Sequence, residues 1–181
     1  MFVYVVLATS SAIGLIWRMK LAEAIARATA PIGATYTFIA LITGSLWGKP
    51  MWGTWWVWDA RLTSELILLF LYLGYIALVS AFDDRRTASR AGAVLALVGV
   101  VNLPIIHFSV EWWNTLHQGP TITKFDQPSI AISMLIPLLL TAAGFKLHFL
   151  VALLASVRAE ILDGERRTAW VAELLARKKH A

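Results

Sequence analysis

The side chains best suited to chemistry lie in a tryptophan-rich segment. Residues 47–59 read WGKPMWGTWWVWD, with five tryptophans, and a second segment supplies Trp112 and Trp113. A membrane-interface belt is one explanation, but belt residues occur singly at helix ends on both sides of a bilayer. The concentration of rings in one loop instead favours a flat aromatic surface for a large planar apolar ligand. The residues assigned to that surface are Trp52, Trp55, Trp56, Trp58, Trp112 and Trp113.

Two histidines accompany the second aromatic segment. A neutral imidazole at His117 is placed to be an axial ligand of haem iron, and a solvated loop histidine is the alternative. His107 lies in an apolar run after Pro104, where it is either functional or bonded to a carbonyl that the proline frees. Ten helical residues span about 15 Å, whereas two axial nitrogens lie only about 4 Å apart. We therefore assign the role of axial ligand to the haem iron to His117 and regard His107 as the less favoured ligand.

Charged residues border the tryptophan-rich segment. Arg61 and Lys49 are suited to pairing with haem propionates, and Asp59 either orients the loop or caps the following helix. The sequence contains no P-loop, no H-E-x-x-H motif and no Ser/His/Asp order. These patterns favour binding over catalysis, so we expect no enzyme.

Composition identifies the class of protein that must position these residues. Of 181 residues, 59% are hydrophobic and 15% are charged, against roughly 45–50% and about 25% in soluble domains. A mean hydropathy of +0.68 agrees, and both a soluble globular domain and a disordered chain are excluded. The absence of cysteine excludes disulfides and C-x-x-C-H haem attachment.

Apolar runs predict an all-α, polytopic membrane helix bundle with five transmembrane helices. The runs cover residues 1–17, 29–47, 62–82, 91–110 and 129–157. Basic residues concentrate in segments 18–27 and 83–90 and in the tail 158–181, which the positive-inside rule places in the cytoplasm. The tryptophan-rich loops then face outward. We expect one membrane domain over 1–181, and no nucleic-acid partner, because the charges form no single stripe.

Three segments resemble a known family. Residues 52–59, WGTWWVWD, resemble the WWD signature of haem-handling membrane proteins. Together with AFDDRR at 81–86 and VNLPIIHFSVEWWNTLHQG at 101–119, they resemble the cytochrome c maturation haem-exporter protein C family (CcmC). The resemblance covers nearly the whole chain and is looser over the fifth helix and the tail.

The resemblance implies six transmembrane helices and a haem-binding WWD loop on the periplasmic face. The resemblance also implies that haem b is a non-covalent, transient cargo. Trp52, Trp55, Trp56, Trp58 and Asp59 match the signature, and His117 matches one ligand histidine. The other family ligand precedes the second family helix, where this chain begins, so we expect the first helix to be missing from this sequence.

The resemblance also implies partners and a location. The haem would pass to a membrane-anchored periplasmic haem chaperone (CcmE type) in c-type cytochrome biogenesis. Further partners are the ATPase and permease subunits of an ABC-transporter complex and a small membrane subunit, all in the bacterial inner membrane. One alternative is a structural permease-like subunit whose tryptophan-rich loop docks a protein, although Asn102 and His107 are the main polar residues in the runs. Another is an electron-transfer subunit, which needs paired histidines on facing helices.

Overall fold

The computed structural model describes residues 1–113, 115, 117, 130–166 and 168–171. Every regular element in this part of the chain is helical. The elements are α1 (Phe2–Trp17), α2 (Lys20–Trp52), α3 (Ala60–Ser80), α4 (Arg85–Val98), the 3₁₀ turn η1 (Gly99–Val101), α5 (Asn102–Trp112) and α6 (Ile132–Gly164). The all-α fold class is therefore confirmed.

In the part of the chain that the structure describes, four helical segments are long and apolar enough to cross a membrane. They are Lys20–Trp52, Ala60–Ser80, Arg85–Trp112 and Ile132–Gly164, and the apolar α1 is shorter, with 16 residues. The third of these segments contains α4, η1 and α5 in succession. Pro104 has no N–H to donate to the carbonyl four residues earlier, and the helix tightens into a 3₁₀ turn just before it. These helices make the chain a multi-pass membrane protein.

Helix α2 corrects one prediction. We expected residues 18–27 to form a connection, but α2 begins at Lys20 and leaves only Arg18 and Met19 as the turn after α1. Arg18 adopts the left-handed conformation with φ of 53°. The segment after it is rich in alanine, which has the highest helix propensity, and its few charges do not interrupt the helix. The basic residues therefore lie on helix ends instead of in a long loop.

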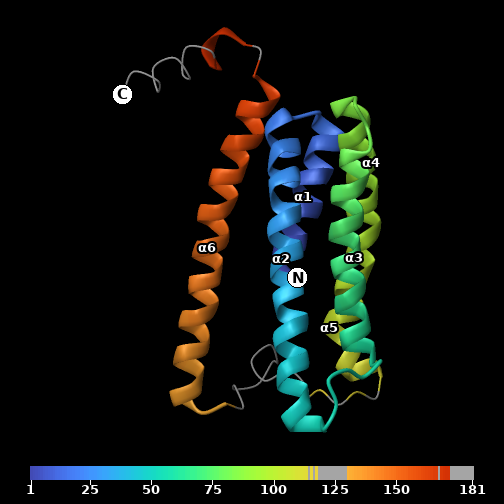
Figure 1. Ribbon diagram of the computed structural model, residues 1–181, viewed down its shortest axis with the longest axis vertical. Helices are drawn as coiled ribbons and strands as arrows, with labels where there is room; N and C mark the ends of the chain where they lie inside the picture. The colour runs from blue at the N-terminus through green and yellow to red at the C-terminus, as the bar shows by residue number, and fades with distance from the viewer. Residues whose placement is uncertain (114, 116, 118–129, 167, 172–181) are drawn as a thin grey trace.

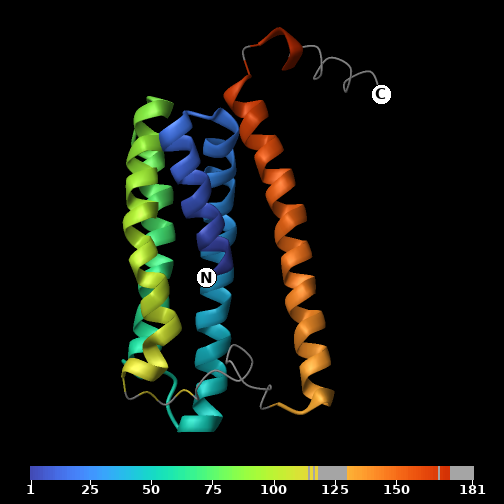
Figure 2. The same ribbon diagram turned by 180° about the vertical axis from the view of Figure 1, so that it is seen from behind.

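The core of the bundle lies between α1, α2, α3 and α4. Tyr4 and Tyr72 are fully buried and pack edge to face, with ring centroids 5.2 Å apart. A Cβ atom at Gly33 would overlap the ring of Tyr72, so glycine lets α2 approach α3 closely there. Figure 2 shows α1 in front of α2 and beside α4. Many of the buried residues of α2 and α4 are alanine or glycine, and their small size allows the helices to pack closely.

Helix α6 stands to one side of the other helices (Figure 1), and Phe149 is its one buried residue. It contacts α2 through Tyr36, whose hydroxyl lies 2.6 Å from His148 Nδ1 and donates to the Phe145 carbonyl. Leu153 is partly buried against the core, and most other apolar side chains of α6 are exposed. The bundle has two distinct ends: one carries the α2–α3 loop, and the other carries the start of α2, the start of α4 and the end of α6.

Candidate functional site

The α2–α3 loop carries the tryptophan-rich segment, and hydrogen bonds hold its backbone. Helix α2 continues through Trp52, beyond the predicted end at residue 47, and stops at Gly53, whose φ of 75° suits glycine. The hydroxyl of Ser45 donates to the Trp55 carbonyl at 2.7 Å, and the Lys49 ammonium donates to the Gly53 carbonyl at 3.1 Å. The loop is therefore tied back to the last turns of α2.

Asp59 ends the loop and makes two different contacts. One carboxylate oxygen accepts the backbone N–H of Leu62 at 2.8 Å, which makes Asp59 the N-cap of α3. The other oxygen lies 2.8 Å from Nδ1 of His117. The Asp59 side chain is 5% exposed and the His117 side chain 20% exposed. The capping role predicted for Asp59 is confirmed, and the same carboxylate also holds a histidine 58 positions away.

Trp52 completes the surroundings of His117. Its indole packs edge to face on the imidazole, with centroids 4.7 Å apart and planes at 69°. Trp47 packs in turn on Trp52 at 5.2 Å and 85°. The backbone N–H of His117 donates to the Thr115 hydroxyl at 3.1 Å. The imidazole is thus fixed by a carboxylate on one side and an indole edge on another.

The remaining loop tryptophans present separate rings. Trp58 is 75% exposed and Trp55 is 53% exposed. Trp56 is partly buried against the core and meets Trp58 at an interplanar angle of 77°, and its indole N–H has no hydrogen-bond partner within the described residues. Neighbouring rings therefore lie nearly perpendicular, so they do not form the single flat surface expected from the sequence. The exposed rings of Trp55 and Trp58 therefore present separate apolar faces.

The structure does not gather all of the predicted site residues. Phe108 and Trp112 stack with centroids 5.2 Å apart, and Trp113 packs against Trp112, both tryptophans being exposed at the end of α5. Within the described part of the chain, no aromatic pair joins them to the α2–α3 loop. Arg61 is partly exposed on the first turn of α3 and forms no ion pair among the described residues.

His107 is separated from the Asp59–His117 pair. Its ring is exposed on α5 and packs edge to face on Phe108 at 4.7 Å. No hydrogen bond from His107 is present in the described residues, so the alternative of a bond to a carbonyl freed by Pro104 finds no support.

Lys49 lies 5.8 Å from the centroid of the Trp55 ring, close enough for a cation–π contact.

Sequence reasoning missed the pairing of Asp59 with His117. Each residue was singled out, but for a separate role, and nothing in local spacing predicts a contact over 58 positions. The available signal was that both polar side chains occur within aromatic loops assigned to the same side of the membrane. If the Asp59 carboxylate is buried in such a loop, it requires a hydrogen-bond or ion-pair partner. His117 was one of the basic residues assigned to that side.

Fold and site together define a polytopic membrane protein with a tryptophan-rich loop and an Asp–His pair at one end of its helices. The family model described as "Heme exporter protein C" matches residues 1–172. The chain belongs to that family, which confirms the resemblance drawn from the WWD signature.

Relatives agree over most of the chain. It is 58% identical over 178 residues to "Heme exporter protein C" of Escherichia coli K12, a match that covers 98% of this chain and 71% of the relative. It is 55% identical over 174 residues to the protein of the same name from Haemophilus influenzae, covering 96% and 71%. A cytochrome c biosynthesis ccmC-like mitochondrial protein of Marchantia polymorpha is 46% identical over 145 residues, covering 80% and 60%.

Proposed function

We propose that this protein serves haem export in c-type cytochrome biogenesis by binding haem b at its tryptophan-rich end and passing it to a periplasmic haem chaperone. The observation that carries the proposal is the 2.8 Å contact between Asp59 and His117 beside Trp52. The names of the relatives, which refer to haem export and cytochrome c biosynthesis, support the same cargo.

The carboxylate prepares His117 for iron. A buried carboxylate that accepts a hydrogen bond from Nδ1–H fixes the tautomer of the imidazole and leaves the Nε2 lone pair as the metal-binding nitrogen. This is the arrangement by which proteins commonly orient histidine ligands. His117 therefore provides one axial ligand, and Asp59 acts through it as a positioning residue.

Other groups at this end suit the rest of the haem molecule. The exposed faces of Trp55 and Trp58 offer apolar contact with the porphyrin. The indole N–H of Trp56, which has no partner among the described residues, would donate a hydrogen bond to a propionate or to a bound partner. Lys49 and Arg61 add positive charge for the propionates. Trp112 and Trp113 would contact the haem from the α5 side.

We name no second axial ligand among the described residues. His107 is the less favoured metal ligand because it lies on the exposed face of α5 without a partner that orients it. The resemblance to the CcmC family implies that a second ligand histidine completes the site. Transfer would then be a binding step, in which a ligand of the chaperone replaces His117 on the iron.

We place the protein in the bacterial inner membrane with the tryptophan-rich end in the periplasm. The basic residues at the opposite end support this orientation through the positive-inside rule. The proposed partners are the haem chaperone, the ATPase and permease subunits of an ABC complex and the small membrane subunit. The tail beyond residue 171 lies outside the described residues, and we expect it in the cytoplasm.

The proposal is tested by the haem absorbance of the detergent-purified protein. His117→Ala should abolish the Soret band at unchanged helix content, because His117 lies in a loop. Trp55→Ala should weaken haem binding, since it removes an exposed ring. His107→Ala is the matched control and should retain the band.

Two results would contradict the proposal. Equal Soret absorbance in His117→Ala and wild type would remove His117 as the ligand. Failure of the wild-type protein to bind added haem would favour the permease-like alternative, in which the tryptophan-rich loop docks a protein.

A further inference from the structure

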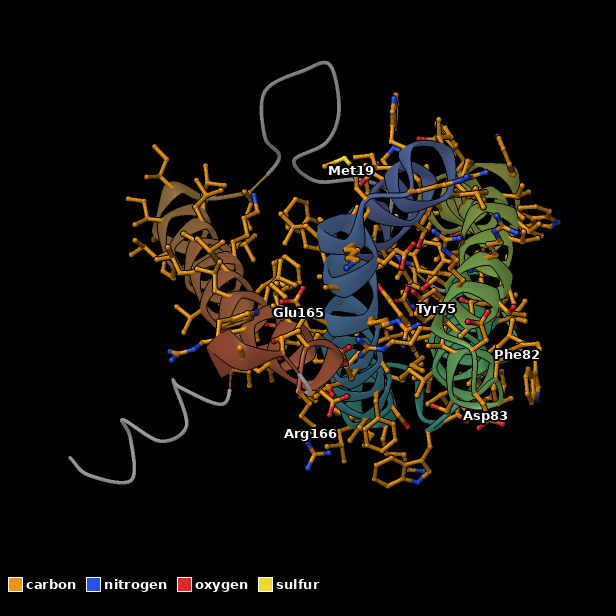
Figure 3. The ribbon with its side chains drawn as sticks, turned by 90° about the horizontal axis from the view of Figure 1, so that it is seen from above. Met19, Tyr75, Phe82, Asp83, Glu165 and Arg166 are labelled. Carbon is orange, nitrogen blue, oxygen red and sulfur yellow. The ribbon has the colours of Figure 1, made fainter. Side chains whose placement is uncertain are left out.

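A cavity lies at the end of the bundle opposite the tryptophan-rich loop. Its volume is about 540 Å³, and its walls come from the end of α1, the start of α2, the start of α4 and the end of α6, with Tyr75 of α3. Figure 3 looks onto this end, with Met19, Tyr75 and Glu165 around the region between the helices. The cavity shares no residue with the Asp59–His117 site.

The charge of the lining is strongly unbalanced. Three acidic residues line the cavity, and each already has a partner: Glu160 pairs with Arg85, Glu23 accepts from Ser89, and Glu165 accepts from Trp170. Six basic residues also line it, namely Arg18, Lys20, Arg27, Arg85, Arg86 and Arg90.

The six basic residues exceed the three acidic residues of the lining by three positive charges. Arg27 donates to the Arg85 carbonyl and to the Ser89 hydroxyl. The other four, Arg18, Lys20, Arg86 and Arg90, form no ion pair within the described residues. An excess of cations converging on one cavity favours an anionic occupant.

Two uncharged features of the wall point to the same kind of ligand. Ser11 is 3% exposed and lines the cavity beside Tyr75, and among the described residues its hydroxyl has no hydrogen bond of good geometry. A buried hydroxyl in that state loses free energy unless something binds it. Helix α2 starts at Lys20 beside the cavity without a side-chain cap, so its first backbone N–H groups are also available to an anion.

We propose that this inner-end cavity binds a phosphate ester, and that its source is the headgroup of an anionic phospholipid of the cytoplasmic leaflet. Basic pockets between helices on the cytoplasmic side of a membrane are suited to anionic headgroups. Leu15, Leu21 and Ile161 add apolar surface to the same lining, which fits the glycerol and upper acyl region. The sparse packing of α6 leaves the adjoining helix surface open to acyl chains.

The first test compares lipids by native mass spectrometry of the full chain released from non-ionic detergent. Dioleoylphosphatidylglycerol should remain bound at concentrations at which dioleoylphosphatidylcholine dissociates. Glycerol 3-phosphate, which has the phosphate but no acyl chains, should not displace the lipid. Equal retention of the two lipids would overturn the site, and displacement by glycerol 3-phosphate would overturn the lipid as the source.

Variants locate the binding. Each charge near anionic lipid is worth about a five-fold change in affinity, so Arg18→Gln with Arg90→Gln should weaken phosphatidylglycerol binding roughly 25-fold. Ser11→Ala should weaken it without any change of charge. Arg158→Gln is the matched control, because Arg158 is exposed on α6 but does not line the cavity.

Folding and function are checked separately. Arg18→Lys with Arg90→Lys keeps both charges and should retain the lipid, which separates loss of binding from failure to insert. The haem absorbance of the tryptophan-rich end should be unchanged in all of these variants. If Arg158→Gln weakens lipid binding as much as the double variant, the effect is general membrane electrostatics and the cavity is not a site.

Discussion

Two aspartates cap two consecutive helices of this protein, at opposite ends of the bundle. Asp59 caps α3 at the tryptophan-rich end, and Asp84 caps α4 at the basic end. The Asp84 side chain accepts two local hydrogen bonds, from the backbone N–H of Thr87 at 2.8 Å and from the Thr87 hydroxyl at 2.7 Å. Asp59 uses one oxygen for its cap and gives the other to His117.

The comparison shows how an aspartate N-cap, a common local feature of helices, can also become part of a functional site. Both caps satisfy a backbone N–H that the first helical turn leaves free. The difference lies in the surroundings, because Asp59 is buried and Asp84 is exposed. A buried carboxylate with a free oxygen needs a second donor, and the fold supplies an imidazole there.

The largest effect is expected at Asp59. Asp59→Ala removes the cap, worth about 0.5–2 kcal/mol of stability, and the group that orients His117. Loss of such an orienting partner typically lowers metal affinity about 10–100-fold. Asp59→Asn should keep the cap and the stability but still weaken haem binding. Haem titration and thermal unfolding in detergent measure the two effects.

Asp84→Ala provides the comparison for that experiment. It should lower stability through the same lost cap and leave haem affinity unchanged. If Asp59→Asn bound haem as tightly as wild type, the carboxylate would not position the ligand, and the two aspartates would be equivalent.

A smaller effect is expected from the aromatic contact that holds His117. Trp52→Phe shortens the ring that packs edge to face on the imidazole. Such aromatic pairs contribute about 0.5–1.5 kcal/mol, so haem affinity should fall about two- to ten-fold. Trp17→Phe is the control, because Trp17 is exposed at the basic end. An equal loss in both variants would show that the contact with His117 is unimportant.

The smallest effect is a pH dependence at Asp84. The two hydrogen bonds from Thr87 hold the pKa of this exposed carboxylate below its ordinary value of 3.8. A lowered folded-state pKa means that the carboxylate stabilises the fold above 3.8 and that this contribution declines as the pH falls through and below that value. Asp84→Asn should reduce this decline while keeping the cap.

The measurement is the difference in melting temperature between wild type and Asp84→Asn at neutral and at acidic pH. The difference should shrink or reverse as the medium is acidified. A difference that does not change with pH would mean that the Thr87 contacts do not favour the ionised form.

Local patterns were sufficient for most of the fold. The apolar runs predicted five membrane helices, and the described residues form four of spanning length together with the shorter α1. The cap at Asp59 followed from residue type and position. The failure at residues 18–27 arose because basic side chains suggested a loop, whereas the alanine-rich backbone continues as α2 and its charges lie at the helix end.

The sequence by itself determined the membrane class, the helices and the family, because hydrophobicity, capping and the WWD signature are all read within short windows. Only the tertiary structure decided that Asp59 meets His117, that neighbouring indoles lie edge to face, and that basic residues from separate helices converge on one cavity. Those outcomes depend on how helices pack side by side. Packing joins residues tens of positions apart, and no local pattern records which of them will meet.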